Sequence, residues 1–127
     1  MKKIIILFLF SVNVYAESFY LVCDGVEDQR SLDEKNLIKK SIGFKITDSN
    51  LVYEDSSYET SRNTFYKKTD LQITFNKTNY INDEIESFIQ GDIDRISGGV
   101  QITYNNFITK YSYYFDGTCK TAKDKAF

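Results

Sequence analysis

Residues 18–25, SFYLVCDG, and residues 113–122, YYFDGTCKTA, contain the two cysteines of this 127-residue chain, Cys23 and Cys119. Two cysteines allow one intramolecular disulfide, so Cys23–Cys119 is the predicted bridge in an oxidising compartment. Metal ligation and redox chemistry are disfavoured for this pair, because the sequence has no histidine and no Cys-x-x-Cys spacing. The bridge requires the first and last segments of the domain to be neighbours in the fold.

Most of the chain between these cysteines shows the period-two alternation of half-buried β-strands. In the first predicted strand, Phe19, Leu21 and Cys23 share one face. Ten tyrosines, ten phenylalanines and no proline also fit strands better than helices. The other alternating segments are residues 42–46, 51–53, 71–75, 93–104 with a turn at Ser97-Gly98-Gly99, and 107–115.

Three polar segments interrupt this pattern. Residues 29–40, QRSLDEKNLIKK, predict a short helix or a loop, because Ser31 could cap a helix with Glu34 three residues on. Residues 79–87 predict an irregular or short helical segment, and residues 54–63 predict a connection between strands.

Seven to eight short strands in about 110 residues predict an all-β domain, a small antiparallel barrel or sandwich with at most one or two short helices. In such a domain the first and last strands are expected to have free edges, and pairing them with each other closes the sheet. Gly25 and Gly117 each lie two residues from a cysteine. These glycines are expected to relieve crowding where the two backbones approach closely.

Residues 1–16, MKKIIILFLFSVNVYA, have the layout of a secretory signal peptide. Two lysines precede an unbroken apolar run that is too short to span a bilayer, and Val14 and Ala16 stand at the −3 and −1 positions of a cleavage site. Cleavage after Ala16 leaves a single β domain of residues 17–127. The predicted localisation is periplasmic or secreted.

The charge of the chain disfavours some classes of partner. The formal net charge is −2, and removal of two lysines with the signal peptide makes it −4. A mildly acidic domain without a basic stripe is not expected to bind nucleic acid. After signal cleavage no apolar stretch is long enough for stable membrane insertion. The residues predict no cofactor.

Asp92 and Asp94 are the candidate residues for a catalytic or metal site. They lie two residues apart in a predicted strand, so both carboxylates project from one face, about 6–7 Å apart, where a water molecule or a cation could lie between them. Asp83, Glu84 and Glu86 add upstream acids that could contribute to a calcium site. The alternative interpretation is a solvated strand face beside a turn.

The tyrosines are the candidate binding residues. Tyr104, Tyr111, Tyr113 and Tyr114 lie close together in sequence, and tyrosine is enriched in recognition sites. The alternative interpretation places Tyr111 and Tyr113 in the core and Tyr114 on the outer face.

Three motifs resemble those of small uncharacterised exported proteins of proteobacteria: LVCDG at 21–25, IDRISG at 93–98 and FDGTCK at 115–120. This resemblance implies export and a disulfide-linked β domain, and it implies no activity. Residues 19–25, FYLVCDG, are more faintly similar to the early Tyr-x-Cys of periplasmic inhibitors of C-type lysozyme, which are small exported barrels. Tyr20 and Cys23 lie one residue further apart than in that motif, and the chain has no tryptophan, so no inhibitory residue is carried over.

These observations favour an exported binding protein over an enzyme, with an unidentified protein or a small apolar molecule as the partner. Two alternatives stay open. One is a carboxylate-based hydrolase or calcium-binding module using Asp92 and Asp94, and the other is a structural component of the bacterial envelope.

Overall fold

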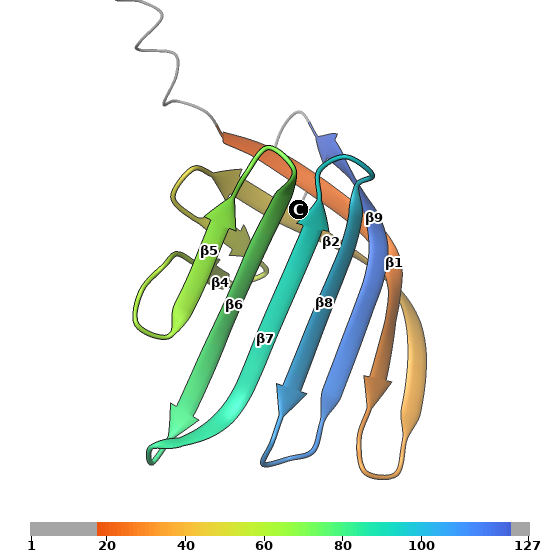
Figure 1. Cartoon of the computed structure of the whole chain (residues 1–127). Helices are drawn as coiled ribbons and strands as arrows, with labels where there is room; N and C mark the ends of the chain where they lie inside the picture. Colours follow the sequence, from red (N-terminus) through yellow and green to blue (C-terminus); the bar gives the residue numbers. More distant parts are fainter. Residues whose placement is uncertain (1–17, 123–127) are drawn as a thin grey trace, which may run out of the picture.

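A computed structural model describes residues 18–122, which form nine β-strands and no helix (Figure 1). Within this range no helix can therefore cross a membrane. The predicted signal peptide, residues 1–16, lies outside the described residues. The strands are β1 (Ser18–Arg30), β2 (Lys35–Thr47), β3 (Leu51–Tyr53), β4 (Ser56–Tyr58), β5 (Thr64–Lys68), β6 (Gln72–Ile81), β7 (Glu84–Asp94), β8 (Gly99–Asn106) and β9 (Ser112–Ala122).

All nine strands belong to one antiparallel sheet that curls into a nearly closed barrel (Figure 1). Its order is β4-β3-β2-β1-β9-β8-β7-β6-β5. The predicted all-β class and the adjacency of the first and last strands are confirmed, with one strand more than the predicted seven to eight.

The free edges of the sheet differ from the sequence-based expectation. β1 lies between β2 and β9, so the two terminal strands of the chain lie in the middle of the sheet. The strands at the ends of the sheet are β4 and β5, which come from the middle of the sequence. Pairing of β1 with β9 therefore joins the two halves of the sheet, and the free edges of the sheet lie at β4 and β5.

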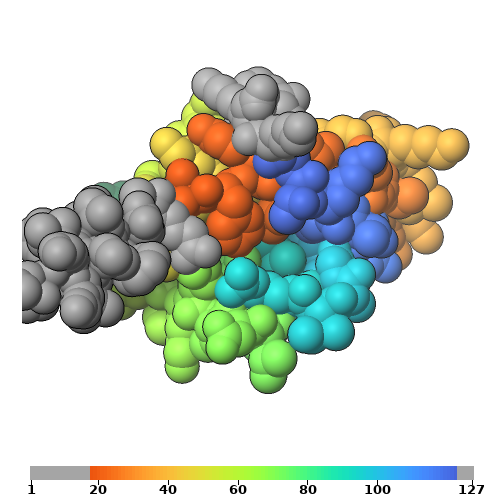
Figure 2. Space-filling view, turned by 90° about the horizontal axis from the view of Figure 1, so that it is seen from above, coloured from red at the N-terminus to blue at the C-terminus, as the bar shows by residue number. Residues whose placement is uncertain are grey.

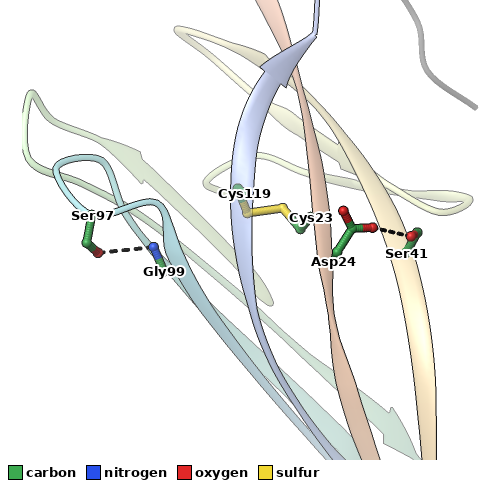
Figure 3. Close-up of a disulfide and its surroundings, with 6 residues drawn as sticks. All are labelled: Cys23, Asp24, Ser41, Ser97, Gly99 and Cys119. Atoms are coloured by element: carbon green, nitrogen blue, oxygen red, sulfur yellow. Dashed lines mark hydrogen bonds between the residues drawn. A yellow bond between two sulfur atoms is a disulfide. The ribbon is translucent and has the colours of Figure 1, made fainter.

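The predicted disulfide between Cys23 and Cys119 is present (Figure 3). The two cysteines are directly opposite each other in the β1–β9 ladder. The N–H of Cys119 points the other way and donates to the carbonyl of Gly98, at 2.7 Å. The cysteines are therefore a non-hydrogen-bonded pair, the arrangement in which antiparallel strands approach most closely.

Gly25 and Gly117 face each other two residues below the disulfide. The space-filling view shows β1 and β9 packed directly against each other (Figure 2). A Cβ on Gly25 would lie 2.6 Å from the Cα of Gly117, and a Cβ on Gly117 would lie 2.5 Å from the carbonyl oxygen of Asp24. The predicted role of both glycines at a close approach of two backbones is confirmed.

Replacing Gly25 with alanine is expected to lower the free energy of unfolding by about 1–3 kcal/mol, because the new methyl group collides with backbone atoms that cannot rotate away. Gly99→Ala is the matched control, since a Cβ there meets only the side chain of Ser97, at 3.3 Å. Urea denaturation of both variants measures the difference. Equal midpoints for Gly25→Ala and Gly99→Ala would contradict the close approach.

Two segments predicted as helical or irregular are instead β-hairpins. Residues 31–34 form the turn between β1 and β2, closed by a hydrogen bond from the Ser31 N–H to the Glu34 carbonyl. The helical prediction for residues 29–40 is wrong because β1 provides a pairing partner along the whole of β2. In residues 79–87, β6 and β7 meet at Asn82-Asp83, whose φ angles of 51° and 67° fit a two-residue hairpin turn. Residues 54–63, predicted as a connection, include β4.

The interior of the barrel has two parts of different chemistry. From the disulfide end to the middle it is filled by apolar side chains, with the rings of Phe44 and Phe75 5.9 Å apart and Phe115 fully buried. Toward the opposite end, which carries the loops 31–34, 82–83 and 107–111, polar residues and tyrosines join the inward positions, beside apolar residues such as Ile38 and Ile89. We call this opposite end, at the bottom of Figure 1, the lower end.

Candidate ligand-binding site

A cavity of about 200 Å³ lies among the inward-facing side chains toward the lower end of the barrel. This volume would hold about seven water molecules, which matches a single small ring. The cavity combines the tip of one hairpin with four long strands, which come together only in the folded barrel. The β3–β4 hairpin contributes Tyr53, Glu54, Ser56 and Tyr58, and β6 to β9 contribute Lys77, Asn79, Ile89, Tyr104 and Tyr113.

Three of the four predicted binding tyrosines form one cluster beside this cavity. The rings of Tyr104 and Tyr113 are stacked with centroids 5.2 Å apart, and the Tyr111 ring lies 6.1 and 6.3 Å from them. Tyr114 is not part of the cluster: it is 40% exposed on the outer face, because successive residues of a strand point to opposite sides. Tyr104 and Tyr113 also pack against the core, so for Tyr113 the binding and the core interpretations are compatible.

The Tyr53 side chain lines the cavity, and its hydroxyl group is buried. Its side chain is 3% exposed, and within residues 18–122 its hydroxyl has no hydrogen-bond partner. Burial raises the pKa of Tyr53, and the neighbouring Tyr113 hydroxyl raises it further without forming a hydrogen bond to it in this conformation. Burial also raises the pKa of Tyr113. Both hydroxyls therefore stay protonated at neutral pH and can donate hydrogen bonds.

A buried carboxylate and its lysine partner lie next to the tyrosine cluster. Glu27 points inward from β1 and is 2% exposed, and its carboxylate accepts a hydrogen bond from the Gln29 amide at 2.7 Å. The Lys40 ammonium lies 3.2 Å from Glu27 and 3.4 Å from Glu54. It also lies 5.9 Å from the centre of the Tyr113 ring. This network joins β1 and β2 to the wall of the cavity.

A second lysine lies on the opposite side of the cavity. The Lys77 ammonium is 4.7 Å from the centre of the Tyr58 ring, a cation–π contact. Beside it, the Asn79 amide donates to the Ser87 hydroxyl at 3.1 Å, and Ser87 is buried. The cavity therefore offers aromatic faces together with amide, hydroxyl and ammonium donors.

Raising the pH above about 10, the pKa of tyrosine in an unfolded chain, is expected to unfold the protein. Burial raises the pKa of five tyrosines, that of Tyr66 to about 12. Because the folded state holds these protons more tightly, the stabilisation is complete below pH 10 and is lost as the pH rises through the folded values. Tyrosinate absorbance and far-UV circular dichroism, followed together, should change in one cooperative step. Ionisation of all tyrosines near pH 10 with an unchanged dichroism spectrum would contradict this burial.

Asp92 and Asp94 project from the outer face of β7, away from the cavity. Asp92 accepts hydrogen bonds from Thr74 at 3.1 Å and Gln72 at 3.3 Å. Asp94 accepts from the backbone N–H groups of Ile96 and Ser97, at 2.8 and 3.2 Å, and these bonds lower its pKa. A general acid needs a raised pKa, so the environment of Asp94 suits a turn cap better than acid catalysis.

The structure does not bring together the acids predicted as calcium ligands. Glu84 and Asp94 are at opposite ends of β7, which at about 3.3 Å per residue places them roughly 33 Å apart. Among residues 18–122 no group of three or more acidic or cysteine side chains is arranged to hold a metal ion.

Several residues of the site, among them Glu27, Tyr53 and Tyr58, were not predicted from the sequence. Glu27 occupies the same face of β1 as Leu21 and Cys23, so an acidic residue on the inward face of this strand could have indicated a site inside the barrel. Tyr53 and Tyr58 carried no such signal, because the sheet order alone brings the β3–β4 hairpin beside β6. Comparisons of the chain with protein-family models, with curated proteins and with solved structures found no match.

Proposed function

We propose that this chain is an exported binding protein, periplasmic or secreted, whose tyrosine-lined cavity holds one flat ring of its ligand. The observation that carries the proposal is the cavity itself, which is lined by four tyrosines, Tyr53, Tyr58, Tyr104 and Tyr113. Tyrosine suits a recognition site because its ring stacks on a ligand while its hydroxyl forms hydrogen bonds.

The chemistry of the lining defines the ligand further. Stacked tyrosines favour a ring with an exposed π or C–H face, and the hydroxyl groups of the tyrosines that line the cavity favour a hydrogen-bond acceptor on that ring. The two carboxylates at the site, Glu27 and Glu54, are balanced by Lys40 and Lys77. A site with balanced charge favours a neutral ring that carries a hydroxyl or carbonyl group.

The location outside the cytoplasm is supported by the Cys23–Cys119 disulfide, which is typical of proteins in oxidising compartments. The signal-peptide pattern at residues 1–16 and the likeness to small exported proteobacterial proteins point in the same direction.

Titration of the oxidised protein with p-cresol, followed by amide NMR shifts, tests the proposal. A ligand of eight heavy atoms is expected to bind with a dissociation constant on the order of 1 mM, with shifts around Tyr53 and Tyr104. Tyr104→Ala should abolish these shifts, whereas Tyr114→Ala, which changes a tyrosine of the outer face, should leave them unchanged.

A second comparison tests the role of the buried hydroxyl. The unmodified protein should bind p-cresol more tightly than toluene, and Tyr53→Phe should remove this preference. Shifts that are absent, or that are scattered over the outer face and survive Tyr104→Ala, would overturn the proposal.

A further inference from the structure

One edge of β2 has no partner over most of its length. β1 pairs with β2 from Lys35 to Thr47, but on the other side β3 pairs only with residues Phe44 to Ile46. Residues 35–43 therefore form a free edge within the part of the chain that the structure describes. This free edge runs from the lower end of the barrel up to the β3–β4 hairpin.

The hydrogen-bond pattern shows which residues of β2 present backbone groups at this edge. The pairs Ser31/Glu34 and Thr47/Asn50 are hydrogen bonded at the two turns that flank β2. With an uninterrupted register, even-numbered residues of β2 bond to β1 and odd-numbered residues point to the other side. The free edge therefore presents the N–H and C=O groups of Lys35, Leu37, Lys39, Ser41 and Gly43.

The corresponding edge of β5 is covered by the chain itself. The Thr60 hydroxyl donates to the carbonyl of Tyr66 at 2.9 Å and accepts from its N–H at 3.2 Å. Native proteins block exposed edges in such ways to prevent unwanted pairing. Within the described residues the edge of β2 has no comparable backbone contact, although it is longer.

The charge of β2 indicates the kind of strand that can pair with it. β2 contains four lysines and no acidic residue. Lysines along an edge oppose pairing with a second copy of the same strand. They favour a partner strand that carries acidic side chains opposite Lys35 and Lys39.

The inward side of the same edge leads to the tyrosine-lined cavity. Ile38 and Lys40 point inward, and Ile38 is 40% exposed. Lys40 contacts Glu54, which lines the cavity, and lies over the Tyr113 ring. A strand added beside β2 would place alternate side chains on this inward face, within reach of Tyr104 and Tyr113.

We propose that the ligand is an extended acidic segment of another protein, which adds to the β2 edge as an antiparallel strand. Its inward side chains would carry the ring that enters the cavity, so the inference rests on the proposed function. Every pairing in the sheet is antiparallel, and strand addition is an established mode of peptide recognition. The added strand would complete the wall of the barrel where β3 ends.

The test uses a fluorescein-labelled peptide of four Glu-Tyr repeats and fluorescence anisotropy on the full oxidised protein. In the antiparallel register the glutamates face Lys35 and Lys39, and the glutamate N–H groups bond to β2. N-methylation of the glutamate amides should weaken binding about tenfold or more, because it removes these donors. N-methylation of the tyrosine amides, which point away from β2, is the matched control and should have little effect.

Variants of the protein provide an independent comparison. Lys39→Pro removes one edge N–H without affecting the bonds to β1, and it should weaken binding about tenfold relative to Lys39→Ala, which removes only the charge. Circular dichroism checks that Lys39→Pro folds, and the N-methylated peptides decide the question if it does not.

The outcomes separate the two proposals. If p-cresol occupies the cavity but the Glu-Tyr peptide does not bind, or binds equally well with methylated glutamate amides, strand addition is wrong and the proposed function stands. If neither probe binds, both are wrong. A dimer of the protein that Lys39→Pro dissociates would also overturn the inference, because the edge would then pair with a second copy.

Discussion

Removing the disulfide by the double substitution Cys23→Ala/Cys119→Ala is expected to lower the free energy of unfolding by about 4–5 kcal/mol. The cysteines are 96 residues apart, so the bond constrains nearly the whole unfolded chain. Cys23 is fully buried, and alanine fits its position without a clash. The measurement is urea denaturation of the double variant against the oxidised protein.

Reduction of the unmodified protein with dithiothreitol provides the control for this prediction. It breaks the same bond without changing a side chain, so its effect should match that of the double variant. A loss below about 1.5 kcal/mol in both experiments would contradict the view that the bond limits the unfolded chain. It would indicate that β1 and β9 stay paired in the unfolded chain even without the disulfide.

The second large effect is expected for Lys40→Met. This variant leaves the Glu27 carboxylate, which is 2% exposed, without its cation, and breaking such a pair costs about 3 kcal/mol. The double variant Lys40→Met/Glu27→Gln should recover most of the loss, because the remaining side chain is uncharged. Thermal and urea denaturation at pH 7 measure all three proteins.

Arg30→Gln is the matched control, since Arg30 forms an ion pair with Asp28 at 3.1 Å on the exposed surface. Its effect should not exceed about 1 kcal/mol. A Lys40→Met protein as stable as Arg30→Gln would show that water reaches Glu27 and that the network is not buried.

The contribution of Lys40 to the free energy of unfolding is expected to decrease at high pH. Burial lowers the pKa of Lys40, but the carboxylates of Glu27 and Glu54 outweigh burial and raise it. A raised pKa stabilises the folded state fully below the unfolded lysine value, about 10.4, and the stabilisation is lost above it. The difference between the unmodified protein and Lys40→Met should therefore be constant near neutral pH.

Two kinds of feature could be predicted from the sequence. One kind follows from the local pattern of residues, and the other from chemistry that allows a single arrangement. Two cysteines allow one bridge, and Gly25 and Gly117 stand beside them at the position where the backbones meet. Alternation also placed Tyr113 and Tyr114 on opposite faces of the last strand, and the structure shows that the face of Tyr113 is the inner one.

The sheet order could not be predicted, because it depends on contacts between distant segments. The two ends of the sheet are β4 and β5, and the opening beside β2 exists because β3 is only three residues long. Nothing in the alternation of residues 51–58 indicates that these strands stop short. The helical prediction for residues 29–40 failed for the same reason, since the extended conformation of Lys35 to Lys40 depends on β1.

The site could be predicted only in part. The tyrosine cluster was accessible because Tyr104, Tyr111 and Tyr113 lie in one stretch of sequence. Lys40 and Tyr53 contribute through the curvature of the barrel, which brings β2 and β3 toward Tyr113 of β9. Asp92 and Asp94 share one face, as predicted, but their hydrogen bonds to the turn and to β6 give them structural roles.

The most direct measurement of the central claim, that the barrel wall is incomplete beside β2, is hydrogen exchange of individual amides in this strand. The amides of Leu37, Lys39 and Ser41 should exchange rapidly, while those of Ile38, Lys40 and Ile42, bonded to β1, should be protected. Addition of the Glu-Tyr peptide should slow exchange at the first set. Uniform protection along residues 36–42 in the free protein would contradict the claim, because it would mean that the edge already has a partner.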